Sequence, residues 1–155
     1  MTHARQQIRA AAATLLAATP TTWGTVCQTR IPPSRPKKDF LMVFSDGESS
    51  EKTTADTPAN YGRRCNLAVI GHLQLPGNTN RETIEDKMDA MAAEIETKLT
   101  FVTLEAALSQ VLGVELLSTE MTVIVNESDE PDHAELSMSF VVDYFTVEGA
   151  PTTLI

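Results

Sequence analysis

The sequence has 155 residues, of which 42% are hydrophobic and 21% are charged. This length and composition are typical of one globular domain, so we expect residues 1–155 to form a single domain that needs no disulfide or metal to fold. The net charge of −9 and the aromatic content of 5% argue against nonspecific binding of duplex DNA and against a stacking surface for single strands. The two cysteines are too few for a disulfide framework, and the apolar runs are too short to span a membrane. With no signal-peptide layout, we expect a soluble protein of a reducing compartment.

The charge is distributed unevenly along the chain. Residues 1–38 carry six Lys and Arg and no acidic residue, whereas the remainder carries six basic and 21 acidic side chains. Complementary charges set register and partner choice in protein assemblies. The asymmetry therefore suggests complementary protein surfaces, and an accidental bias of a solvated surface is an equally good explanation.

The first part of the chain predicts a helix followed by two strands. Apolar residues at helical spacing predict a helix over Ile8–Leu16, which Pro20 ends. The β-rich segment Thr21–Ile31 predicts a first strand. The continuous apolar run Phe40–Phe44 predicts a central strand that is buried on both faces.

A polar segment comes next. Residues 46–60 contain no large apolar side chain, and a connection of this length is usually functional or disordered, so we expect a flexible loop. Beyond it, apolar and polar residues alternate over Cys65–Leu75, which predicts a half-buried strand that protrudes towards the loop.

The pattern then changes to two helices. Thr79 and Glu82 fit a capping box, and apolar residues over Ile84–Leu99 recur at helical spacing. A shorter helix is predicted over Leu104–Leu112, with Gly113 as the residue that ends it.

Two strands close the pattern, over Leu116–Val125 and Leu136–Thr146, and residues 149–155 are expected to form an extended tail with an apolar end. The order α-β-β-β-α-α-β-β favours an α+β fold. We expect a single mixed or antiparallel sheet with helices packed on one face, plus a long protruding hairpin or loop.

Candidate catalytic groups do not fit together. Cys65 and His72 are an odd number of residues apart on one predicted strand, so they face opposite sides and cannot form a nucleophile–base pair. Cys65 is best explained as a small buried hydrophobe. A zinc site would need His3, His72 and His133 to converge, and nothing in their spacing supports this.

The sequence also lacks the motifs of calcium-binding and nucleotide-binding sites. Asp46-Gly47-Glu48 lacks the later ligands of a calcium loop, and the acidic turn 126–132 is typical of a solvated surface. No phosphate-binding loop, nucleophile elbow or metalloprotease motif occurs. We therefore expect no enzyme, no catalytic residue, no cofactor and no metal site.

The order of elements resembles the tail terminator, or tail completion, proteins of long-tailed bacteriophages, the lambda-type minor tail protein U family. The resemblance covers nearly the whole chain and is architectural, without a catalytic signature. The segments that carry it are Ile8–Leu16, Asp39–Phe44, Tyr61–Leu75, Thr79–Leu99 and Leu136–Phe145. The Pro-rich basic segment 30–38 departs from the family pattern.

The resemblance implies a structural virion protein that forms a six-membered ring at the head-proximal end of the tail tube. Such a ring ends tube polymerisation and offers a surface to the head-completion or connector protein. DNA passes through its lumen without specific binding, and an acidic wall would favour sliding. Assembly would take place in the host cytoplasm, with no membrane involved.

A ring of identical subunits needs two different patches that complement each other. We expect basic residues 30–38 with Arg63 and Arg64 to meet acidic residues 127–135, or the loop 46–60 to lie in the contact. The candidate subunit-interface or tube-interface residues are Arg30, Arg35, Lys37, Lys38, Asp46, Glu48, Glu51, Arg63, Arg64, Glu127, Asp129, Glu130 and Asp132.

Two other classes of function stay open. One is another neck or tail component, such as a head–tail connector or a tail tube subunit. The other, less favoured, is a small cytoplasmic enzyme or ligand-binding domain, for which the sequence offers no pocket residues.

Overall fold

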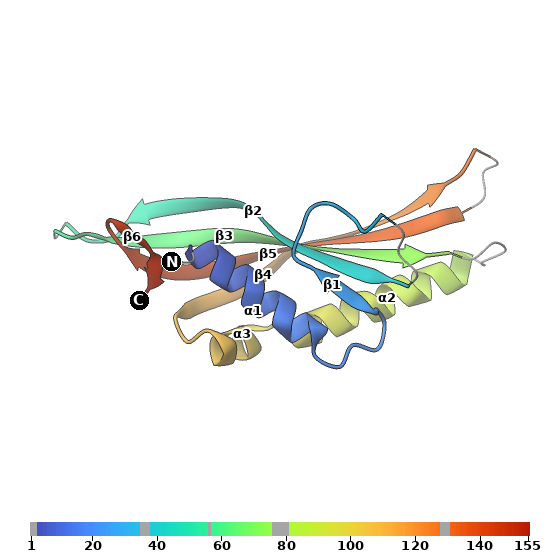
Figure 1. Ribbon diagram of the computed structural model, residues 1–155, viewed down its shortest axis with the longest axis horizontal. Helices are drawn as coiled ribbons and strands as arrows, with labels where there is room; N and C mark the ends of the chain where they lie inside the picture. Colours follow the sequence, from blue (N-terminus) through green and yellow to red (C-terminus); the bar gives the residue numbers. More distant parts are fainter. Residues whose placement is uncertain (1–2, 35–37, 56, 76–80, 128–130) are drawn as a thin grey trace.

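Six strands form one sheet in the computed structural model, which describes residues 3–34, 38–55, 57–75, 81–127 and 131–155. The strand order is β1-β2-β3-β5-β4, with β6 paired to β5. Only β1 and β2 are parallel. The helices cover one face of this sheet (Figure 1), so the predicted α+β class is confirmed. The elements are α1 (Ala4–Ala17), β1 (Thr25–Cys27), β2 (Phe40–Lys52), β3 (Asn60–Gln74), α2 (Arg81–Lys98), α3 (Phe101–Ala107), β4 (Val111–Val125), β5 (Pro131–Val147) and β6 (Ala150–Leu154).

The core lies between the helices and the facing side of β2, β3 and β5. Alternate residues of β3, from Cys65 to Leu73, point into it, and so do alternate residues of β5 from Ala134 to Thr146. The apolar stripe predicted for the long helix is confirmed, because Ile84, Met88 and Ile95 of α2 are fully buried. No helix in the described part of the chain is both long and apolar enough to cross a membrane.

Glu94 of α2 forms hydrogen bonds to the segment between α1 and β1. Its carboxylate accepts four hydrogen bonds of 2.7 to 2.9 Å from the backbone amides and hydroxyls of Thr21 and Thr22. Burial acts to raise the pKa of Glu94, but these hydrogen bonds outweigh it and lower the pKa from 4.5 to about 2. The strand expected over Thr21–Ile31 is shorter than predicted and spans Thr25–Cys27. Thr21 and Thr22, at its expected start, hydrogen-bond to Glu94 instead.

The prediction of a loop over residues 46–60 is wrong in its first half. β2 continues to Lys52 and β3 begins at Asn60, so the connection comprises residues 53–59 only. Ser, Thr and Glu are strand-compatible when a neighbour supplies backbone partners, and β3 supplies them from Asn66 to Tyr61. Figure 1 shows this end of β2 and β3 running beyond α1 as the expected protruding hairpin.

The second helix ends earlier than expected, and the extended tail pairs with the sheet. α3 ends at Ala107 and β4 begins at Val111, so Gly113 lies in a strand rather than at a helix end. The apolar residues near Leu112 fit the spacing of a helix and also that of a strand. The backbone pairing with β5 makes this segment a strand. The tail is not free, since β6 pairs with β5 and Leu154 is buried in the protein's own core. The predicted capping residue Thr79 lies outside the described residues.

Candidate assembly interface

The edge strand β4 exposes large apolar side chains. It pairs with β5 alone, so its outer edge has no strand partner among the described residues. Edge strands in natural proteins are usually short or protected by Lys or Pro. In contrast, β4 has 15 residues and contains no Lys, Arg or Pro. Its protection is limited to two acidic residues and three register shifts. Six apolar side chains of β4 are between 36% and 55% exposed, and they are Leu112, Leu116, Leu117, Met121, Ile124 and Val125. Such a strand is suited to pairing with another chain.

A second free edge lies on β2, at the other side of the sheet. β1 pairs only with Phe40–Met42, so residues 43–52 form a ladder with β3 alone in the described structure. Arg30 contacts this edge, donating to the Ser45 carbonyl oxygen at 2.6 Å and to the Asp46 carboxylate at 3.0 Å. The two free edges differ in sequence and position, which is what a head-to-tail contact between identical copies requires.

Glu48 is the centre of a largely buried polar cluster on the helix side of the sheet. It accepts hydrogen bonds from Arg63 and from the Tyr144 hydroxyl, and the Arg5 guanidinium of α1 lies 3.6 Å away. Arg63 Nε also donates to the Thr146 hydroxyl at 2.6 Å. Burial, reinforced by the hydrogen bond to Glu48, raises the pKa of Tyr144 well above its ordinary value. Two predicted interface residues, Glu48 and Arg63, thus bind each other within the chain.

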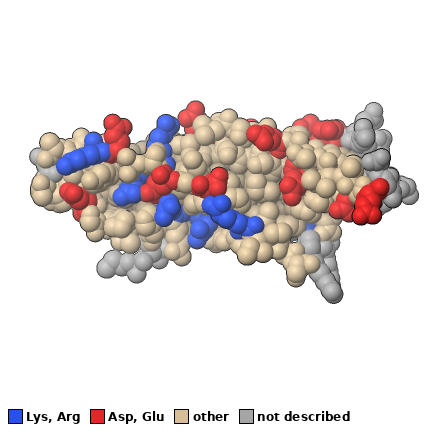
Figure 2. Space-filling model, turned by 90° about the horizontal axis from the view of Figure 1, so that it is seen from above, with Lys and Arg blue, Asp and Glu red and all other residues tan. Residues whose placement is uncertain are grey.

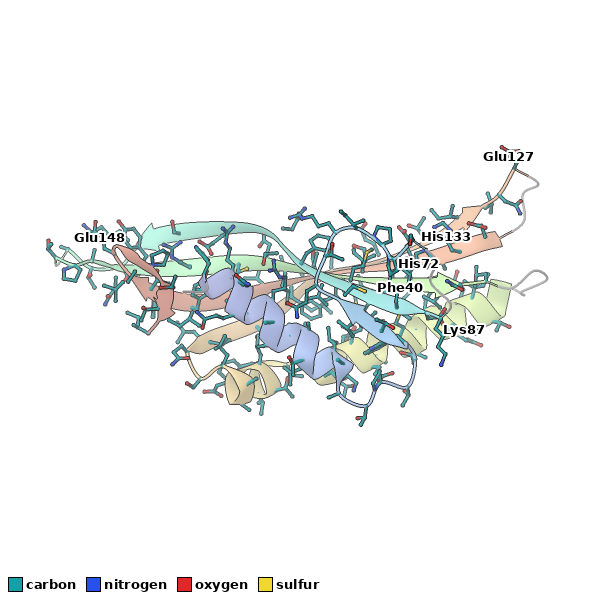
Figure 3. All side chains as sticks on the ribbon, in the orientation of Figure 1. Phe40, His72, Lys87, Glu127, His133 and Glu148 are labelled. Atoms are coloured by element: carbon teal, nitrogen blue, oxygen red, sulfur yellow. The ribbon has the colours of Figure 1, made fainter. Side chains whose placement is uncertain are left out.

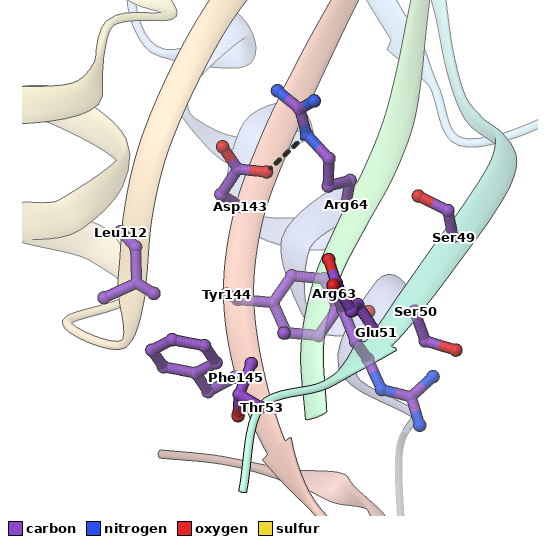
Figure 4. A pocket seen from close by; sticks show the side chains of 11 residues that line it. Ser49, Ser50, Glu51, Thr53, Arg63, Arg64, Leu112, Asp143, Tyr144 and Phe145 are labelled. Carbon is purple, nitrogen blue, oxygen red and sulfur yellow. Dashed lines mark hydrogen bonds and ion pairs between the residues drawn. The ribbon is translucent and has the colours of Figure 1, made fainter. Parts of the chain in front are cut away.

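Arg64 has a different environment from its neighbour Arg63. Its Nε donates to Asp143 at 3.0 Å, and its guanidinium lies 3.8 Å from Glu115. The side chain of Arg64 is 58% exposed, and such exposed pairs contribute up to about 1 kcal/mol. This pair borders a cavity of about 470 Å³ between the ends of β2, β3 and β5 (Figure 4). Arg64 is therefore accessible to a partner, unlike Arg63.

The remaining predicted interface residues lie at the surface or outside the described ranges. The exposed ones are Lys38, Glu51, Glu127 and Asp132. Those outside the described residues are Arg35, Lys37, Asp129 and Glu130. Among the described residues, no ion pair joins the basic segment 30–38 to the acidic segment 127–135. Their proposed meeting between subunits stays a prediction.

The charges on the sheet side of the molecule are sorted along its length. In Figure 2, Lys and Arg gather on the half that contains the β2–β3 hairpin, while Asp and Glu dominate the half that ends at the β4–β5 turn. The visible face is thus mixed in charge at the hairpin half and mainly acidic at the other half.

Comparison with known proteins gives likenesses to solved structures only. No protein-family model and no curated protein matches the chain. Among solved structures, the chain is similar to one from the virion of a native gene transfer agent particle, at 17% sequence identity and a TM-score of 0.43. The match covers 95% of this chain and 92% of that chain. At this TM-score, the likeness does not assign a function to this protein.

Proposed function

We propose that the protein is a structural component of a phage-like virion and that it forms a ring at the head-proximal end of the tail tube. The observation that carries the ring proposal is the pair of unlike free edges in one sheet, β4 and residues 43–52 of β2. The resemblance in element order to tail terminator proteins supplies the place of the ring in the virion. In this proposal the ring ends tube polymerisation and presents a surface for head attachment.

The contact joins β4 of one copy to the outer half of β2 of the next. Main-chain hydrogen bonds along the two edges would each contribute about 0.5–1.5 kcal/mol. Covering a side chain such as Leu117, which is now 55% exposed, would add about half of the roughly 1.5–3 kcal/mol that complete burial of a leucine contributes. Because the two edges are not the same surface, the contact repeats around an axis and closes when the rotation divides a full turn, as in a ring of six.

The partners follow from this placement. The tail tube protein would bind one side of the ring and the head-completion or connector protein the other. DNA would pass through the lumen, and the net charge of −9 would disfavour sticking to its phosphates.

Another neck or tail component is the second candidate. The same two edges would give an open polymer, as for a tail tube subunit, when the rotation does not close, and a ring at another place, as for a head–tail connector, when it does. An enzyme is less favoured. The described residues that line the cavity of about 470 Å³ beside Arg64 include no His and no Cys, so that cavity offers neither a thiol nucleophile nor an imidazole base.

Electron microscopy of the purified protein, alone and mixed with isolated tail tubes, tests this proposal. Closed rings that bind one end of a tube and stop further addition of tube protein support a terminator. Long filaments support a tube subunit, and single particles that ignore added tubes contradict both.

A further inference from the structure

His72 of β3 lies beside His133 and Glu135 of β5. One ligand atom from each of the three side chains lies within 4.8 Å of the other two. The sheet register explains this, because Glu135 is directly opposite His72 and His133 is two residues before Glu135 on the same face. Figure 3 shows His72 and His133 close together, next to Phe40.

A carboxylate orients His133 for metal binding. Asp132 Oδ2 lies 2.8 Å from His133 Nδ1, so a proton on Nδ1 leaves the lone pair on Nε2. That nitrogen lies 3.9 Å from Glu135 Oε1. Metal-binding histidines in proteins almost always hold their second nitrogen in this way.

His72 contributes an independent observation. Its Nδ1 is buried and has no hydrogen-bond partner in the described structure, and such a buried polar atom is costly unless something binds it. Burial, together with the nearby His133, lowers the pKa of His72.

We propose that His72, His133 and Glu135 bind a divalent transition-metal ion such as Zn²⁺. Two imidazole nitrogens and one carboxylate, with a fourth position for water, are a common ligand set for zinc. Ligand atoms around a tetrahedral zinc lie roughly 3.3 Å apart, as bond lengths of about 2.0 Å require, so the three ligand atoms, which now lie within 4.8 Å of one another, would have to come closer together.

One rearrangement is required. The rings of His72 and His133 are stacked, with centroids 4.6 Å apart and 15° between their planes. Imidazole binds a metal in the plane of its ring, so at least one ring must turn about its Cβ–Cγ bond. A cavity of about 350 Å³ beside the two rings, also lined by Gln74, Leu75 and Asp132, gives room for this turn and a path for the ion.

This site is independent of the ring proposal, since its ligands come from two strands of one chain. Titration with Co²⁺, a spectroscopic substitute for zinc, tests it. The intact protein should bind one equivalent with the visible absorption of a tetrahedral ion. It should lack the ultraviolet band of a cobalt–thiolate bond, because Cys27 and Cys65 are not ligands.

Variants identify the ligands. H72A and H133A should weaken binding at least about 100-fold, and E135Q and D132N about 10-fold to 100-fold. His3 is the remaining histidine and accepts a hydrogen bond from the Arg5 amide at the start of α1. H3N keeps a capping acceptor and should bind Co²⁺ normally.

Zn²⁺ titration of the unmodified protein, followed by NMR of the histidine rings, gives a reading that needs no variant. The His72 and His133 signals should shift together at one equivalent while the His3 signal stays in place. No binding up to millimolar ion, a thiolate band, or normal binding by H133A would overturn the proposal.

Discussion

Gly71 of β3 lies directly beneath Met91 of α2, so closely that a Cβ at this position would overlap the Met91 sulfur. The same Cβ would also come within 3.4 Å of Leu136 and Leu41. Position 71 has no room for a side chain because α2 packs against the sheet here through Met91, which is fully buried.

Gly71→Val should destabilise the protein by about 1–3 kcal/mol, the usual cost of overfilling a core. Gly113→Val is a matched control, because a Cβ there has its nearest neighbours at 3.5 Å and 3.8 Å, both on Asp143. Urea denaturation of the two variants measures the difference. Equal unfolding midpoints would contradict the placement of α2.

Arg63 and Arg64 are adjacent in sequence but should respond differently to substitution. Arg63→Met leaves the largely buried Glu48 carboxylate without its ion-pair partner in β3, which should cost about 3 kcal/mol. Arg64→Met removes an exposed pair with Asp143 and should change the free energy of unfolding by less than about 1 kcal/mol. Thermal and chemical denaturation compare the two, and similar losses would refute the buried cluster.

Glu94 should make stability depend on pH in the acid range. Its folded-state pKa of about 2 lies below its ordinary value of 4.5, so its contribution is complete above pH 4.5 and is lost as the pH falls towards 2. Glu94→Gln does not titrate. The stability difference between the two proteins should therefore be largest at neutral pH and shrink between pH 4.5 and 2. A constant difference across this range, measured by urea denaturation, would contradict the carboxylate's role.

The effect of salt on assembly should distinguish between the two possible subunit contacts. The exposed charges of the β2 edge nearly balance, because Asp46 pairs with Arg30 and Glu51 is followed by Lys52, so edge-to-edge assembly should change little with salt. A contact between basic residues 30–38 and acidic residues 127–135 would instead weaken. Sedimentation in low salt and in about 0.5 M NaCl reports which occurs, and assembly that decreases with salt would point to the charged patches.

Periodicity was sufficient to predict the core-forming elements. Met88 and Ile95 in α2 follow a regular apolar spacing, and Cys65–Leu73 in β3 alternate, because each buries one face against the same core. The polar part of β2 was missed since backbone pairing, not side-chain burial, holds Ser49–Lys52 in the strand. A single sequence does not show which backbone will be available as a partner.

The candidate sites depended on register, which local patterns do not reveal. His72 and His133 are distant in sequence and meet only because β3 and β5 are antiparallel neighbours. Glu48 and Arg63 were predicted as interface charges, but the strand pairing brings them together inside the chain. The exposed edge of β4 likewise follows from its terminal place in the sheet, although apolar Leu116 and Leu117, adjacent in sequence, were a sign that both faces are apolar.

The direct test of edge pairing is the mass of the assembled protein in solution, measured for the unmodified chain and for Leu117→Lys. Val102→Lys is the control, because Val102 is 70% exposed and lies on α3, outside β4. The unmodified protein and the control should form one closed assembly of more than two copies, and Leu117→Lys should remain a folded monomer. A monomer or a simple dimer at all concentrations, or an unchanged assembly of Leu117→Lys, would contradict a ring built through β4.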